Sequence, residues 1–299
     1  MLQLWCEMPA MRGRVVVAGA VGVASGCFCW FVLKHFHQDA GDFRWALHLA
    51  SRLVAGQNPY DTPYEQYPLP AAFVALPLLR LAPEAAAGIF WGVSSALLAF
   101  GLTRENYARL WIFLAYPYWA GLLAVQWPPL IAASAFFPLL LPVTMMKPQV
   151  GLPVFLTRLS RNGALACIFV AGVSFAVMPQ WLLLWIRQTH YYEHFVPLLI
   201  FPGPLLLLAL LKYRSPDAWL LLVSSCMPQR WFFDAFILWL IPRSRREISL
   251  TVFASWGAGL WRWYHPPHSF TEVGRWSVIF LYLPMLAVVL LRQKSREQT

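Results

Sequence analysis

The sequence predicts an all-α polytopic membrane protein, and three observations predict it. Of the 299 residues, 59% are hydrophobic and only 12% are charged, whereas charged residues make up about a quarter of an ordinary soluble domain. Long apolar runs recur along the whole chain, and the basic residues stand in short clusters between these runs. Because a chain in lipid must satisfy its backbone polar groups internally, helices are the expected element.

The apolar runs divide into candidate spans, and we expect about ten to twelve transmembrane helices in a single integral membrane domain over residues 1–299. The first run follows Arg12 and Arg14 and continues without a polar cleavage region, which predicts an uncleaved signal-anchor. Several runs are shorter than the roughly 20 residues of a full crossing, so we expect some helices to be short, broken or re-entrant. The candidate spans are 15–33, 68–82, 86–102, 109–125, 130–145, 148–157, 163–185, 196–211, 216–228, 230–242, 247–264 and 275–291.

The basic clusters predict the orientation. If the N-terminus is cytoplasmic and the spans alternate, the clusters at 158–161, 212–214 and 243–246 and the C-terminal tail all lie inside, as the positive-inside rule requires. We therefore expect a multi-pass protein of the plasma (inner) membrane with both termini cytoplasmic and residues 34–67 outside. The same pattern explains the net charge of +10. Membrane lipids are the expected partners and nucleic acid is not, because no basic surface is interleaved with stacking aromatics.

Residues 34–67 form the longest polar segment of the chain. Within this first outer loop, apolar residues recur at three- and four-residue spacing over 43–55, which predicts an amphipathic helix lying along the membrane interface. Asp42 stands at the N-cap position of this helix, and Gly56 and Pro59 supply its end.

Four acidic residues lie in this loop, in a chain with only 13: Asp39, Asp42, Asp61 and Glu65. A carboxylate at the membrane surface can act as a general base on a hydroxyl. For Asp42 the alternative is structural, because an N-cap carboxylate accepts backbone N–H bonds and stabilises a helix by about 1 kcal/mol. The two roles are compatible, since a capped carboxylate is held in a fixed orientation.

Two basic residues stand next to apolar runs. Lys147 either faces a partner or polar cavity or extends its amine to a lipid headgroup, and as a cation it can offset a lipid phosphate. Arg230 follows a proline break and is a second candidate for a phosphate, although Asp234 at i+4 can simply pair with it. His35-x-His37-x-Asp39 would offer metal ligands only on a strand, where a helix end is expected, so we expect no metal.

Five motifs in a fixed order resemble glycosyltransferase family 87, polyprenol-phosphate-sugar-dependent enzymes of the GT-C superfamily. The order and spacing are similar over residues 15–160, about half of the chain, and the family more often has Gly-Gln where Val125-Gln126 stands. The motifs are Asp42-Phe43, Gly56-Gln57-Asn58-Pro59-Tyr60-Asp61, Tyr67-Pro68-Leu69-Pro70, Gln126-Trp127-Pro128-Pro129 and Lys147-Pro148-Gln149.

The resemblance implies a GT-C-like bundle that transfers a hexose, typically mannose, from a polyprenyl-phosphate sugar to the hydroxyl of a glycan or lipid acceptor. Transfer would invert the anomeric carbon at the outer face of the membrane. The lipid-phosphate sugar is a substrate, so no cofactor is implied. The residues implied are Asp42 as general base, Lys147 and Arg230 at the donor phosphate, and Tyr60, Gln126 and Gln149 as substrate-binding side chains.

Two alternatives stay open. A transporter or flippase for a lipid-linked envelope intermediate would also have broken helices and charge inside the membrane, but the chain shows no internal repeat and little charge within the spans. A non-catalytic membrane scaffold is the other. Convergence of Asp42, Lys147 and Arg230 on one outer cavity favours the enzyme, and divergence favours the structural interpretations.

Overall fold

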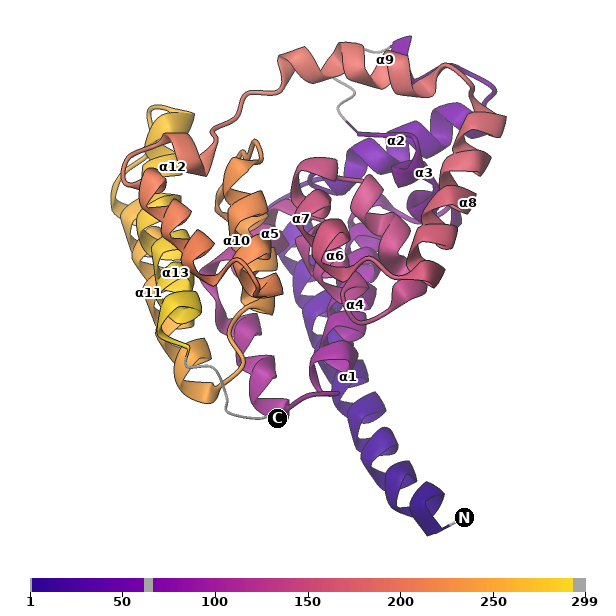
Figure 1. Cartoon of the computed structure of the whole chain (residues 1–299). Helices are drawn as coiled ribbons and strands as arrows, with labels where there is room; N and C mark the ends of the chain where they lie inside the picture. Colours follow the sequence, from indigo (N-terminus) through magenta and orange to yellow (C-terminus); the bar gives the residue numbers. More distant parts are fainter. Residues whose placement is uncertain (1, 62–66, 293–299) are drawn as a thin grey trace.

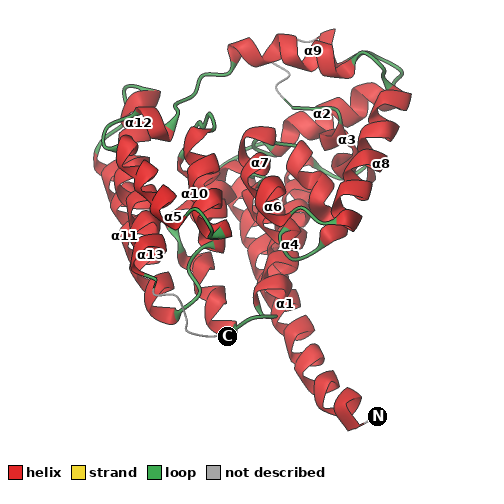
Figure 2. Ribbon diagram, viewed as in Figure 1, coloured by secondary structure: helices red, strands yellow, loops and turns green. Residues whose placement is uncertain are grey.

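The computed structural model describes residues 2–61 and 67–292. Every regular element in these ranges is helical, as Figure 2 shows, and the only β-type contact in them is an isolated antiparallel bridge between Phe195 and Gln229. The prediction of an all-α protein is therefore confirmed.

Three helices in these ranges are long and apolar enough to cross a membrane. They are Met11–His35 within α1 (Leu2–His35), α4 (Pro83–Leu102), and the stretch Phe270–Leu291, which joins α12 (Phe270–Ser277), a π-helical turn (Val278–Tyr282) and α13 (Leu283–Leu291). A fourth span is possible if α8 (Arg161–Val177) and α9 (Trp181–Gln188), which meet at 94°, count as one. Helices with the length and composition of membrane spans are thus present in the described residues, but the predicted number of ten to twelve is not confirmed.

Prolines interrupt several of the other apolar runs. The run 109–125 begins as a 3-10 helix and restarts as α5 (Tyr116–Ala124), and the run 130–145 divides into α6 (Pro128–Ser134) and a second 3-10 helix. Proline lacks the N–H that continues a helix and disfavours helical geometry in the residue before it. The two 3-10 helices of these runs are Tyr107–Leu114 and Pro138–Met145. The remaining runs form α3 (Pro70–Ala75), α7 (Pro148–Arg158), α10 (Pro216–Cys226), 3-10 helices at Gly203–Lys212 and Phe232–Leu240, and the continuous, proline-free helix α11 (Arg245–Tyr264).

The helices form two groups, and α2 (Phe43–Val54) and α9 lie at one end of the molecule. Figure 1 shows α1, α4 and α6–α8 in one group and α10–α13 in the other, with α10 also packed on α7. Helix α9 lies above the first group, and the segment after it runs across to the second. Helix α2 lies at the same end as α9, where α1 finishes, while the N-terminal part of α1 projects away from the bundle. This end carries the polar side chains considered below.

The helix predicted over 43–55 is confirmed as α2, which buries Phe43, Ala46, Leu49 and Ala50. The Phe43 ring stacks on Phe90 of α4 with 4.2 Å between ring centroids, and the centroid of Trp127 lies 6.0 Å from that of Phe43. The helix ends at Val54, and Gly56 two residues further on has a φ of +68°, a left-handed conformation suited to glycine. The aromatic contacts fix the first turn of α2 against the bundle and thereby fix Asp42.

An ion-pair network joins α10, α11 and α13. The buried carboxylate of Asp217 accepts from Arg292 at 2.6 Å and from Arg243 at 3.1 Å, and Arg292 also pairs with Glu247 at 2.8 Å. Because these residues begin or follow three different helices, the network ties together the second helix group.

Candidate functional site

Four side chains from distant parts of the sequence form one hydrogen-bonded chain. The Gln126 amide donates to the Asp42 carboxylate, and Lys147 Nζ donates to Gln126 Oε1 at 2.6 Å and to Asp234 Oδ1 at 2.7 Å. The second oxygen of Asp234 accepts from the backbone N–H of Arg230 at 2.9 Å. Gln126, Lys147 and Asp234 are buried, and Asp42 is partly exposed. One carboxylate is therefore held at the surface by a chain that ends on a buried ion pair.

Two residues with a left-handed backbone conformation, Gly41 and Val125, precede Asp42 and Gln126 and bring them together. Gly41 has φ +55° and Val125 has φ +50°, and the Asp42 N–H donates to the carbonyl of Ala124 at 2.9 Å. A Cβ on Gly41 would lie 2.6 Å from that carbonyl oxygen, so only glycine fits there. A β-branched residue such as Val125 rarely adopts positive φ, and such strained backbone is concentrated at functional sites.

The predicted N-cap role of Asp42 is wrong. The side chain of Asp42 makes no capping hydrogen bond to α2, and its own backbone is already helical, with φ −69° and ψ −19°. A capping residue normally has an extended backbone from which its side chain reaches back to the first turn. The carboxylate is instead oriented by Gln126.

The structural alternatives for the two cations also fail. Lys147 is only 5% exposed and pairs with Asp234, so its amine does not extend to a headgroup. Asp234 does not pair with the side chain of Arg230 but accepts from its backbone N–H. The exposed guanidinium of Arg230 lies 6.0 Å from the Tyr192 ring, and no carboxylate of the described residues lies within ion-pair distance of it.

Asp42, Lys147 and Arg230 converge on one polar cavity, which Gln149 also lines. The side chains that complete the lining are Trp45, Tyr67, Pro68, Met146, Pro148, Tyr192 and Phe233. The cavity volume is about 30 Å³, which is room for one or two water molecules and not for a sugar. A larger ligand must therefore separate some of these side chains.

Of the three predicted substrate-binding residues, Gln149 lines the cavity, whereas Gln126 and Tyr60 do not. Gln149 Nε2 donates to the Tyr192 hydroxyl at 3.2 Å, and Gln126 lies behind the lining and contacts Asp42 and Lys147. Tyr60 is buried beside the cavity wall, where its hydroxyl donates to the Tyr67 carbonyl at 3.2 Å. Tyr60 thus supports the segment that carries Tyr67.

Sequence reasoning missed three residues of the site. Asp234 was considered only as a partner of Arg230, although a lone carboxylate in the apolar run 230–242 is itself a signal of a buried partner. Tyr67 and Tyr192 lie outside the spans. Tyr67 belongs to the motif Tyr67-Pro68-Leu69-Pro70 but was given no role, and no local pattern marks Tyr192. Burial raises the pKa of both hydroxyls well above the usual range, so they stay protonated and can donate hydrogen bonds.

A second cavity has a volume of about 360 Å³ and shares no lining residue with the first. Its wall includes Glu193 and Trp231, the sequence neighbours of Tyr192 and Arg230, together with His268 and Phe270. The bridge between Phe195 and Gln229, with both N–H···O distances at 2.7 Å, holds these two segments side by side. This second cavity falls in the size range of ordinary ligand pockets.

The described residues contain no group of three or more His, Cys, Asp or Glu side chains that could hold a metal ion. His35 is the last residue of α1 and His37 has φ +51°, so the alternating His35-x-His37-x-Asp39 spacing does not lie on a strand.

Comparisons of the chain with models of known protein families, with curated proteins and with solved structures found no match.

Proposed function

We propose that this protein is a membrane glycosyltransferase that moves a hexose, with mannose as first candidate, from a polyprenyl-phosphate sugar to the hydroxyl of a glycan or lipid acceptor. The observation that carries the proposal is the convergence of Asp42, Lys147 and Arg230 on one cavity at the end of the membrane helices. A partly exposed carboxylate beside two cations offers a base and a phosphate site together. The five ordered motifs that resemble family 87 add the substrate class.

The chemistry needs no group beyond these side chains. The Asp42 carboxylate takes the proton of the acceptor hydroxyl while the hydroxyl oxygen attacks the anomeric carbon. The bond between that carbon and the phosphate oxygen breaks, the lipid phosphate leaves with the electron pair, and the anomeric configuration inverts. A fixed cation stabilises the negative charge that develops on the phosphate.

The two cations differ in their availability to a phosphate. Lys147 already pairs with Asp234 and donates to Gln126, so an incoming phosphate competes with both. The guanidinium of Arg230 is exposed at the cavity, and an arginine fork matches phosphate oxygens well. We therefore assign the first phosphate contact to Arg230. Lys147 orients Gln126, and through it Asp42, and joins the phosphate when the donor opens the cavity.

The second cavity supplies a place for the acceptor. Trp231 and Phe270 give it an aromatic wall, and Glu193 gives it a carboxylate that can accept hydrogen bonds from hydroxyl groups. Because the second cavity is lined by Glu193 and Trp231, the sequence neighbours of Tyr192 and Arg230, we place the acceptor there, beside a donor held on Arg230. The site would face outside a plasma (inner) membrane, with both termini cytoplasmic and membrane lipids around the spans.

The direct test is transfer by the purified protein in phospholipid nanodiscs, with polyprenyl-phosphate mannose as donor and soluble alkyl mannosides as acceptors. We expect a product glycoside whose anomeric configuration is opposite to that of the donor. A protein that leaves the donor intact with every acceptor, but moves it between the leaflets of a vesicle, would be a flippase instead. If the protein catalyses neither transfer nor flipping, the non-catalytic scaffold is the remaining interpretation.

A further inference from the structure

A close contact of glycines joins α1 and α4. Gly22 and Gly26 of α1 face Gly88 and Gly92 of α4, and a Cβ on Gly26 would lie 2.8 Å from the Gly88 carbonyl oxygen. A Cβ on Gly92 would likewise lie 2.8 Å from the Gly22 carbonyl oxygen. Small residues four apart on both helices let the two backbones touch, as in packed membrane helices.

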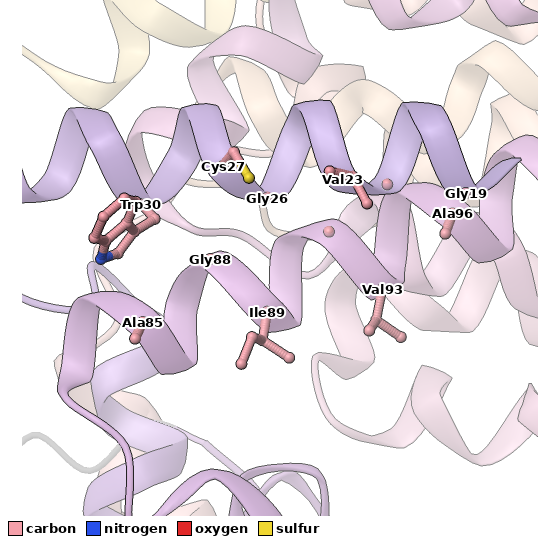
Figure 3. A pocket seen from close by; sticks show the side chains of 12 residues that line it. Gly19, Val23, Gly26, Cys27, Trp30, Ala85, Gly88, Ile89, Val93 and Ala96 are labelled. Atoms are coloured by element: carbon pink, nitrogen blue, oxygen red, sulfur yellow. The ribbon is translucent and has the colours of Figure 1, made fainter. Parts of the chain in front are cut away.

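An apolar groove of about 490 Å³ runs along the outer side of this contact. Figure 3 shows Trp30 at one end of the groove and Gly19 and Ala96 at the other, with Val23, Ile89 and Val93 along it. Val23, Ile89 and Val93 are 68%, 46% and 52% exposed, so the groove opens away from the protein. Because α1 and α4 are two of the three membrane-length helices, the groove opens into hydrocarbon.

The length of the groove matches one leaflet. Gly19 and Trp30 are 11 residues apart, which is about 17 Å of helix at about 1.5 Å per residue. That is roughly half of the ~30 Å hydrocarbon core. The Trp30 end lies toward the end of α1, on the side of α2 and the polar cavity.

A cation stands at this same end. Lys34 is exposed one helical turn beyond Trp30, and its Nζ lies 5.2 Å from the centroid of the Trp30 ring. Among the described carboxylates, none lies within ion-pair distance of Lys34. The groove therefore offers an apolar channel of one leaflet's length with an uncompensated positive charge at its membrane-surface end.

We propose that this groove binds one acyl chain of an anionic phospholipid, with the lipid phosphate on Lys34. The site does not depend on the proposed sugar transfer. A helix of a second copy is the competing occupant, but the glycine faces that such a helix would need are already used between α1 and α4. An acyl chain is flexible enough to follow the remaining hollow between Val23 and Ile89.

The test compares two glycines that are matched in their surroundings. A Cβ on Gly19 in the groove, or on Gly172 of α8, would meet nothing within 4 Å. Both Gly19→Leu and Gly172→Leu should therefore fold. The protein is purified from vesicles of phosphatidylcholine and phosphatidylglycerol, and native mass spectrometry counts the retained lipids. We expect wild type and Gly172→Leu to retain one phosphatidylglycerol that Gly19→Leu loses.

The charge is tested in the same way. Lys34→Gln should reduce the preference for phosphatidylglycerol over phosphatidylcholine about fivefold, the effect of one lysine at an anionic surface (about 1 kcal/mol). The matched control is Arg44→Gln, since Arg44 is exposed on α2 and its guanidinium lies 4.9 Å from the Trp45 ring, away from the groove. This control should keep the wild-type preference.

A measurement on the folded wild-type groove completes the test. Phosphatidylglycerol with brominated chains should quench the fluorescence of Trp30 more than brominated phosphatidylcholine does, and Trp30→Phe should remove that difference. Equal lipid retention by the two leucine variants, or equal quenching by the two lipids, would overturn the proposal. A change from dimer to monomer in Gly19→Leu with unchanged lipid retention would also overturn it and assign the groove to a second copy.

Discussion

Replacing Lys147 by methionine removes one charge of the buried pair and keeps an unbranched side chain that is shorter by one atom. Asp234 is fully buried and Lys147 is 5% exposed, so the remaining carboxylate would be left without its cation. Breaking a buried pair by removing one partner costs about 3–5 kcal/mol. The cavity beside Lys147 can admit water that partly solvates the carboxylate, so we take the lower end, about 3 kcal/mol.

A second substitution separates the ion pair from a simple packing defect. In the Lys147→Met and Asp234→Asn double variant no buried charge remains, and the asparagine oxygen can still accept from the Arg230 N–H. We expect the double variant to cost only about 1–2 kcal/mol, because a buried pair replaced by neutral groups is often nearly neutral. The summed destabilisation of the single variants Lys147→Met and Asp234→Asn should therefore exceed that of the double variant by about 2 kcal/mol or more.

The assay is unfolding by a denaturing detergent in mixed micelles, followed by tryptophan fluorescence, with the free energy of unfolding taken from the linear dependence on denaturant. Strictly additive single effects would mean that Lys147 and Asp234 do not pair in the folded protein. A cost of Lys147→Met below about 0.5 kcal/mol, the size of an ordinary surface substitution, would lead to the same conclusion.

Three further predictions concern the backbone turn, the phosphate site and the ion-pair network. Gly41→Ala should destabilise the protein by more than the roughly 1–2 kcal/mol typical of a non-glycine residue in a left-handed conformation, because the added Cβ meets the Ala124 carbonyl. Gly56 also has a left-handed conformation but lies in open space, so Gly56→Ala should cost no more than that. The same unfolding assay measures both variants. Arg230→Gln should raise the KM for the lipid-phosphate donor about tenfold, because a charge-assisted contact is lost. Arg187 is exposed on α9, and Arg187→Gln should leave this KM unchanged. Equal KM values for the two variants would remove Arg230 from the donor site. Asp217→Asn should lower the stability by about 1–2 kcal/mol, since the paired arginines are partly exposed, and a thermal midpoint equal to that of wild type would show that the network contributes nothing.

Local patterns predicted those parts of the molecule that depend on periodicity. The 3.6-residue spacing of apolar residues predicted α2 almost to its observed ends, Phe43–Val54. The apolar runs of α1, α4 and Phe270–Leu291 were also identified correctly. Hydropathy predicted more spans than the three helices of membrane-spanning length in the described residues, because it does not register where prolines such as Pro117 and Pro179 interrupt a run.

The candidate site shows the opposite limit. The family resemblance implied one site for Asp42, Lys147 and Arg230, and all three line one cavity. The contacts of Asp42 with Gln126 and of Lys147 with Asp234 join residues 84 and 87 positions apart, and no local pattern specifies such pairs. The positive φ of Val125 was equally hidden, because β-branched residues are the least expected in that conformation.

The most direct test of the proposed function compares Asp42→Asn with Asp61→Asn in the sugar-transfer assay. Both carboxylates belong to the same polar segment, but Asp61 lies outside the cavity and accepts from Asn58 Nδ2 at 2.6 Å. We expect Asp42→Asn to keep the wild-type unfolding midpoint and donor binding and to lower kcat by about 10²–10⁴-fold, the usual contribution of a general base. Asp61→Asn should transfer at the wild-type rate. Full transfer by folded Asp42→Asn would contradict the assignment of Asp42 as the base.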